Sequence, residues 1–211
     1  MGLEDLLAHP HIWRGRSRAA KDGLPTGFAA LDRYLPGGGW PRRAVTEIYL
    51  EHYGIGELSL LMPALAGLCR ESEALRWIVW VAPPFVPYAP ALRRRGIDLD
   101  RVLLVHPSTA QVRRAQMRRA NDVLWAVEQT VRSGSSIAVL AWLEEAGHLV
   151  LRRLQLAAEA NGCWTVLFRP VKAMRQISPA VLRMKLSRRE HKARVEIFKC
   201  RGAKPKVVDL E

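Results

Sequence analysis

Short apolar runs recur along the chain and are separated by longer polar segments. Each run is rich in β-branched or aromatic residues and is bounded by glycine, proline or charged residues. Runs of this kind are typical of strands that are buried on both faces of a parallel sheet. The pattern predicts strands at residues 44–50, 77–82, 102–105, 137–142 and 164–168.

The segments between these runs have the spacing of amphipathic helices. Helices are predicted at residues 57–70, 90–95, 112–132 and 148–160. Gly134 and Gly162 follow the last two and fit the C-cap position. Parallel neighbouring strands need crossover connections, and here strands alternate with helices. The sequence therefore predicts an α/β fold around a doubly wound, mainly parallel sheet flanked by helices.

The two ends of the chain differ from this middle part. Residues 1–23 combine a short apolar stripe with a basic, small-residue stretch, which predicts a leading helix and a linker. Residues 24–202 are expected to form the core domain and residues 203–211 a C-terminal tail. A strand is predicted at 195–199, and the segment 206–210 could join it as an antiparallel edge of the sheet, but the favoured interpretation of the tail is a fraying terminus.

Composition narrows the classes of function. The 211 residues are 49% hydrophobic and 25% charged, which is typical of a globular protein. A formal net charge of +13 predicts attraction to anionic polymers or to acidic partner surfaces. No signal segment or membrane span is visible, so we expect a cytoplasmic protein. The three cysteines match no metal or redox spacing and are expected to be reduced core thiols.

The loop after the first predicted strand is where an α/β sheet would hold a phosphate group. A P-loop there needs the pattern Gly-x-x-x-x-Gly-Lys-Ser/Thr. This chain keeps Gly56 but has Glu51 at the first glycine position, Glu57 at the lysine position and Leu58 at the hydroxyl position. An anion in place of the cation reverses the main electrostatic attraction to phosphate. We therefore predict no cofactor, no bound metal and no enzymatic activity.

The order of segments from residue 24 to about 202 resembles the RecA-like core. The stretches that carry this resemblance are 26–27, 31–32, 38–41, 47–49, 88–89 and 92–98. Within that superfamily the chain looks most like the ImuA family, some members of which are described as SulA-like. The stretches that carry the second resemblance are 35–41, 82–90, 151–155, 157–159, 168–170 and 199–202.

The ImuA resemblance implies a function and a set of partners. It implies a RecA-like fold with a degenerate P-loop and a non-catalytic accessory role in SOS-induced translesion DNA synthesis. The implied partners are RecA, an ImuB-like inactive homologue of Y-family polymerases and an error-prone DnaE-type polymerase. Weak DNA binding through charge would accompany these contacts. The resemblance does not fix the oligomeric state or which surface meets which partner.

Two basic clusters and one tryptophan are the candidate binding residues. The denser cluster consists of Arg183, Lys185, Arg188, Arg189, Lys192 and Arg194. A second set at helical spacing consists of Arg113, Arg114, Arg118 and Arg119. Both could hold nucleic acid or an acidic protein surface, although the second set equally fits a solvated helix face. Trp40, in a glycine-rich loop between prolines, is a candidate contact residue.

Three alternatives stay open at this point. The first is a SulA-type cell division inhibitor that binds FtsZ, which is another binding function. The second is an ATPase that uses a displaced loop, for which magnesium–ATP binding would be the test. The third is a DNA-binding protein whose affinity falls steeply with salt and needs no protein partner.

Overall fold

We describe the fold from a computed structural model of the chain, which describes residues 22–71, 76–106, 113–189 and 192–210, with the side chains of 113–119 left aside. The predicted leading helix and most of its linker lie outside these residues. The main strands are β3 (Val45–Leu50), β4 (Trp77–Val81), β5 (Val102–Val105), β6 (Ser136–Trp142), β7 (Trp164–Pro170), β8 (Leu182–Arg189), β9 (Lys192–Cys200) and β10 (Lys206–Leu210). The longer helices are α3 (Glu57–Glu71), α5 (Arg113–Arg132) and α6 (His148–Asn161).

Shorter elements complete the described chain. Strands β1 (Gly23–Leu24) and β2 (Trp40–Pro41) pair as a small antiparallel ribbon. The short helices are α2 (Ala29–Asp32), α4 (Ala89–Arg94), η1 (Pro36–Gly38), η2 (Leu99–Arg101) and η3 (Val171–Arg175). Helix α3 begins at Glu57, as predicted, and contains Pro63 in its interior.

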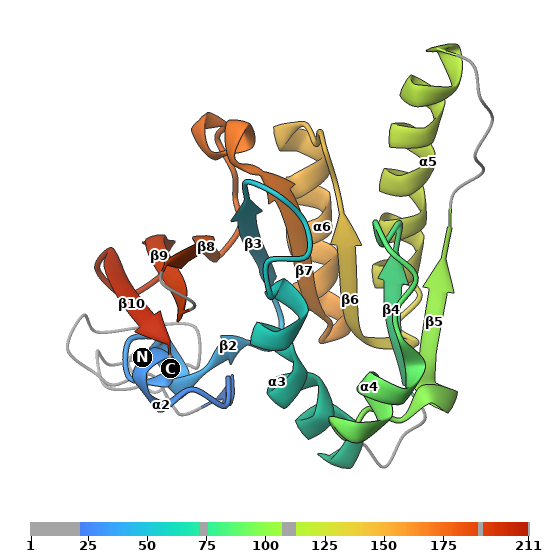
Figure 1. The fold of residues 1–211 in the computed structure, drawn as a ribbon. Helices are drawn as coiled ribbons and strands as arrows, with labels where there is room; N and C mark the ends of the chain where they lie inside the picture. The colour runs from blue at the N-terminus through green and yellow to red at the C-terminus, as the bar shows by residue number, and fades with distance from the viewer. Residues whose placement is uncertain (1–21, 72–75, 107–112, 190–191, 211) are drawn as a thin grey trace, which may run out of the picture.

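The main sheet has eight strands in the order β10-β9-β8-β3-β7-β6-β4-β5. Strand β3 lies between β7 and β8 and is parallel to both. Strands β8, β9 and β10 pair antiparallel with one another. Figure 1 shows this antiparallel part at one end of the sheet and β4 and β5 at the other.

The predicted fold class, a RecA-like doubly wound and mainly parallel sheet, is wrong because the sheet is mixed. Strand β8 ends at Arg189 and β9 begins at Lys192, and β9 ends at Cys200 and β10 begins at Lys206. A parallel crossover needs about a dozen residues or more. Links this short force the chain to reverse, so the C-terminal third of the sheet is an antiparallel meander.

The C-terminal residues belong to this meander. Strand β10 pairs with β9 from Lys206 opposite Ile197 to Leu210 opposite Ala193. Val208 and Leu210 are buried in the main core. The favoured prediction of a fraying terminus is therefore wrong, and the alternative of an antiparallel edge strand is confirmed. The division of the chain into a core at 24–202 and a tail stays a prediction.

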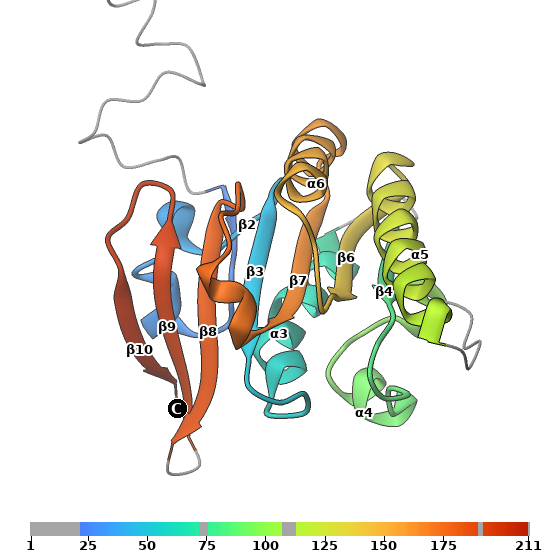
Figure 2. The same ribbon diagram turned by 90° about the horizontal axis from the view of Figure 1, so that it is seen from above.

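Helices cover the two faces of the sheet unequally. One face packs against α3, and this core extends across the sheet as far as β10. The other face packs against α5 and α6, which contact β3, β4 and β6. Figure 2 shows α6 over β3 and β7 and α5 over β4, with neither helix reaching β8, β9 or β10. Among the described helices, none therefore covers this face of the antiparallel part.

Membrane insertion is not suggested by any described helix. Among the helices in the part of the chain that the structure describes, none combines the length and the apolar character that crossing a bilayer requires.

Candidate partner-binding surface

The loop after β3 is closed by a side chain of its own. Glu57, the first residue of α3, is buried, with 3% of its surface exposed. Its carboxylate accepts hydrogen bonds from the backbone N–H of Gly54, at 2.8 and 3.1 Å, and of Gly56, at 3.2 Å. These amides at a helix N-terminus are the kind of donors that hold a phosphate in a P-loop. The Glu57 carboxylate therefore occupies the position that an anionic ligand would need.

The neighbouring positions in this loop have structural contacts. Glu51 accepts a hydrogen bond from Lys185 Nζ at 2.8 Å. This bond and the ammonium charge lower the pKa of Glu51. Leu58 packs partly buried against the main core. The loop thus lacks the lysine and the hydroxyl of a P-loop and is stabilised by its own carboxylates.

Exposed apolar residues gather in the loop after β4. Phe85, Val86 and Tyr88 have exposed fractions of 65%, 83% and 72%. We call these three residues the apolar loop. A Cβ built on Gly54 would lie 3.7 Å from Phe85 Cε2, so the apolar loop lies beside the loop closed by Glu57. Large apolar side chains clustered on a surface mark interaction sites.

Tyr53 lies at the same end of the sheet. Its side chain is half-buried, and burial, followed by the charges of Glu144 and Glu57, raises the pKa of Tyr53. The C-terminal ends of β3, β4 and β6 thus bring together apolar and acidic side chains. This combination suits contact with a protein surface.

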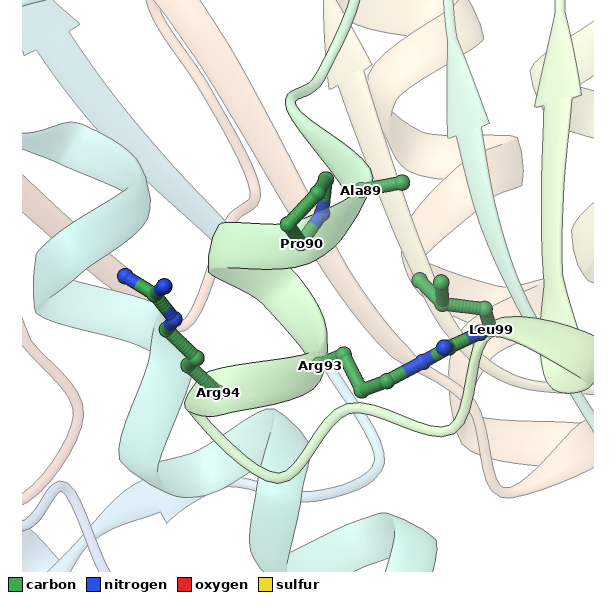
Figure 3. A pocket seen from close by; sticks show the side chains of 5 residues that line it. All are labelled: Ala89, Pro90, Arg93, Arg94 and Leu99. Atoms are coloured by element: carbon green, nitrogen blue, oxygen red, sulfur yellow. The ribbon is translucent and has the colours of Figure 1, made fainter.

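A shallow pocket lies beside α4, next to the apolar loop in sequence. It has a volume of about 440 Å³ and is lined by Ala89, Pro90, Arg93, Arg94 and Leu99. Figure 3 shows the Arg93 side chain extending toward Leu99, whereas the Arg94 side chain points away from it. The two guanidinium groups therefore do not converge on one ligand position.

A buried ion network joins side chains of β3, β7 and β8. Glu47 is fully buried and its carboxylate accepts from Arg169 Nη1 at 2.6 Å and from Arg183 Nε at 2.9 Å. Tyr49 donates to Glu47 at 2.8 Å, and burial, followed by the Glu47 charge, raises the pKa of Tyr49 to about 12. Every member of this network has partners inside the protein, so its function is structural.

The dense basic cluster is divided by the strands that carry it. Arg183 is buried in the ion network, and Lys185 pairs with Glu51. Arg194 lies 3.9 Å from both Glu196 and Asp209. Arg188, Arg189 and Lys192 are exposed where β8 meets β9. Successive side chains of a strand point to opposite faces of the sheet, so these cations do not form one continuous basic surface.

The other predicted binding residues also have clear positions. Arg113, Arg114, Arg118 and Arg119 fall in the first turns of α5, and their side chains lie outside the described part. Trp40 is fully buried and packs against Trp164 with a ring-centroid distance of 5.7 Å. Its predicted role as a contact residue is therefore wrong, because the glycine loop folds the ring inward onto the sheet.

The apolar loop is the surface that sequence reasoning missed. Its signal was present in the prolines at positions 83, 84 and 87, which flank Phe85 and Val86. Proline restricts the backbone and removes a hydrogen-bond donor, so such a segment cannot continue a helix or a central strand. Within the described residues, no three His, Cys, Asp or Glu side chains gather into a possible metal site.

Comparison with known proteins gives two relatives with a common name. The chain is 33% identical over 113 residues to the cell division inhibitor SulA of Edwardsiella piscicida, covering 54% of this chain and 60% of that protein. It is 32% identical over 103 residues to SulA of Pseudomonas aeruginosa, covering 48% and 56%. The chain thus spans less than two thirds of the length of each relative.

Two further comparisons complete this result. The crystal structure of SulA from Pseudomonas aeruginosa superposes with a TM-score of 0.45 and 26% identity, covering 60% of this chain and 97% of that one. No protein-family model matches the chain.

These findings correct the expected function. The relatives are named as inhibitors of cell division, not as ImuA-type proteins or as enzymes. An accessory role in translesion synthesis is therefore wrong. The implied partners RecA, the ImuB-like protein and the DnaE-type polymerase are wrong for the same reason.

Proposed function

We propose that this protein is a SulA-type inhibitor of cell division that binds FtsZ in the cytoplasm as part of the SOS response to DNA damage. The observation that carries the proposal is the similarity to two SulA proteins, at 33% and 32% identity over about half of this chain. Inhibition by binding needs no catalytic group. The closed loop at Glu57, whose carboxylate engages the amides of Gly54 and Gly56, agrees with such an activity.

We further propose the apolar loop as the surface that contacts FtsZ. Large apolar and aromatic side chains carry most of the binding energy in protein interfaces when a partner covers them. Phe85 and Tyr88 are 65% and 72% exposed, so covering them would bury apolar area that is now in water. The exposed cations Arg188, Arg189 and Lys192 stay predicted partner contacts, and weak DNA binding stays a prediction as well.

Expression in a rod-shaped bacterium tests the activity. Induced protein should block septation and produce filaments, and purified protein should reduce the amount of FtsZ that pellets with GTP. Phe85→Ser with Tyr88→Ser should weaken both effects, by about tenfold or more in the concentration needed. The matched control is Trp125→Ser, because Trp125 is also 65% exposed but lies on α5.

Each result has a separate meaning. Normal division and unchanged FtsZ pelleting with the wild-type protein would refute the proposed function. Filamentation that is lost equally in the Trp125 control and the loop variant would refute the apolar loop as the contact surface while leaving the function intact. Thermal unfolding of both variants shows whether the substitutions leave the fold unchanged.

A further inference from the structure

A second concave surface lies away from the apolar loop, on the sheet face that carries α6. It is a groove of about 400 Å³ between α6, the segment before β8 and the end of β9. Its lining residues are Arg152, Gln155, Leu156, Glu159, Pro179, Ala180, Val181, Lys199, Cys200 and Arg201. We call it the α6 groove. Its volume falls within the range of pockets that bind ligands.

Cations dominate the charge of the α6 groove. Arg152 and Arg201 line it, and neither forms an ion pair with another described residue. Lys199 lies half-buried and donates to the backbone carbonyl of Ser178 at 2.7 Å. Burial, followed by the charge of Arg183, lowers the pKa of Lys199. An anion in the groove would therefore favour the charged form of Lys199, which burial and the charge of Arg183 now disfavour.

The one carboxylate in the groove is already engaged. Glu159 Oε1 accepts a hydrogen bond from Gln155 Nε2 at 2.8 Å. The Gln155 side chain is in turn fixed, because its Oε1 accepts from the backbone N–H of Val45 at 3.0 Å. The carboxylate is held on the wall by this chain of bonds. Three cations thus face the groove against a single, tethered anion.

The groove also has an apolar wall. Leu156 is 56% exposed on its rim. Pro179 and Ala180 continue this wall on the opposite side, from the segment before β8. A ligand that matched both walls would carry negative charge next to an apolar side chain.

We propose that the α6 groove binds an acidic segment of a partner protein, with carboxylates on Arg152, Lys199 and Arg201 and an apolar side chain on Leu156. Duplex nucleic acid fits less well, because its phosphates repeat along an extended backbone and need a long basic strip rather than a concave site. The proposal does not depend on the proposed function. The groove and the apolar loop come from different elements.

A peptide titration tests the proposal. The probe is a fluorescein-labelled octapeptide of alternating leucine and glutamate, followed by fluorescence anisotropy at low salt. The matched peptide has glutamine in place of glutamate, and a labelled oligothymidine of the same length probes nucleic acid. The wild-type protein should bind the acidic peptide measurably below about 1 mM and at least about tenfold more tightly than the glutamine peptide.

Charge reversal locates the binding. Arg152→Glu with Arg201→Glu should weaken the acidic peptide by about tenfold or more. The control variant, Arg93→Glu with Arg94→Glu, makes the same change in net charge at the pocket beside α4. It should weaken the affinity for the acidic peptide by about twofold or less. Leu156→Asp is a second groove variant, on an exposed position that tolerates a polar side chain, and should also weaken binding.

Three results would overturn the proposal. The first is no binding of the acidic peptide up to about 1 mM. The second is equal weakening by the groove variant and the control, which would mean attraction to the overall charge. The third is tighter binding of oligothymidine than of the peptide in the same groove, which would assign the site to nucleic acid. FtsZ is absent from this assay, so its outcome is independent of the division test.

Discussion

Removal of the Glu57 side chain should open the loop after β3. In Glu57→Ala the backbone N–H groups of Gly54 and Gly56 lose the carboxylate that accepts their hydrogen bonds at 2.8–3.2 Å. The N-terminus of α3 also loses an anion that its dipole stabilises. The variant tests whether Glu57 is the internal anion of this loop.

The size of the effect follows from these contacts. A hydrogen bond to a charged acceptor contributes about 1.5–3 kcal/mol. Gly54 is exposed, so water can replace part of what the carboxylate supplies. We therefore expect a loss of about 2 kcal/mol in the free energy of unfolding. For a chain of this length, that loss lowers the melting temperature by roughly 4–8 °C.

Urea unfolding followed by circular dichroism measures this change. The matched control is Glu51→Ala, since Glu51 belongs to the same loop but its side chain is 56% exposed and pairs with Lys185 on the surface. The Glu51→Ala variant should lower the free energy of unfolding by less than about 0.5 kcal/mol. Glu57→Gln keeps one acceptor oxygen without the charge and should fall between the two.

Two results would contradict the stabilising role of the Glu57 carboxylate. If Glu57→Ala unfolds within about 0.5 kcal/mol of the wild type, the carboxylate does not stabilise the loop. If Glu51→Ala is destabilised as much as Glu57→Ala, general charge effects explain the result. A phosphate titration of the Glu57→Ala variant at constant ionic strength adds a check, because inorganic phosphate should stabilise it more than the wild type.

Three further outcomes are expected. Glu47→Gln leaves the charge of Arg169 buried without its counter-ion at 2.6 Å, and urea unfolding should show a loss of about 3–5 kcal/mol. Gly39→Ala places a Cβ 2.1 Å from the Leu24 carbonyl oxygen, so a calorimetric melt should show a loss of about 1–3 kcal/mol, and an unchanged melting temperature would contradict that steric conflict. Burial raises the pKa of Cys163 from 9.0 to about 11, so the neutral thiol favours the folded state. The contribution of the neutral thiol to the free energy of unfolding is fully present below pH 9 and is lost as the pH rises to about 11. The stability of the wild type should therefore fall over that interval by about 2–3 kcal/mol more than that of Cys163→Ala, and parallel curves would argue against a buried neutral thiol.

The strands of the central sheet could be predicted closely. The run predicted at 77–82 forms β4 (Trp77–Val81), and the run predicted at 164–168 forms β7 (Trp164–Pro170). A short run of apolar residues can bury both faces of a strand with no long-range information. Strand β8 was missed, because its many cations suggested a binding cluster. The alternation of Leu182, Met184 and Leu186 with polar residues was the signal for a half-buried strand.

Side-chain partners depended on tertiary structure. Glu47 lies in a strongly apolar run, and its partners Arg169 and Arg183 are 122 and 136 residues away in the sequence. Only the neighbouring positions of β7, β3 and β8 bring these charges together. The predicted binding role of Arg183 did not anticipate this network, because no local pattern records which strands become neighbours.

The loop after β3 has one property that the sequence determines and others that the tertiary structure decides. The sequence by itself determined that a glutamate stands where a P-loop has lysine, so the electrostatic attraction to phosphate is lost whatever the fold. The tertiary structure decided that this glutamate turns inward onto the amides of Gly54 and Gly56 and that Trp40 is buried against Trp164. It also decided that Arg152 and Lys199, distant in sequence, line one groove. The sign of a charge belongs to a residue type, but its partners and its exposure depend on the packing of distant segments.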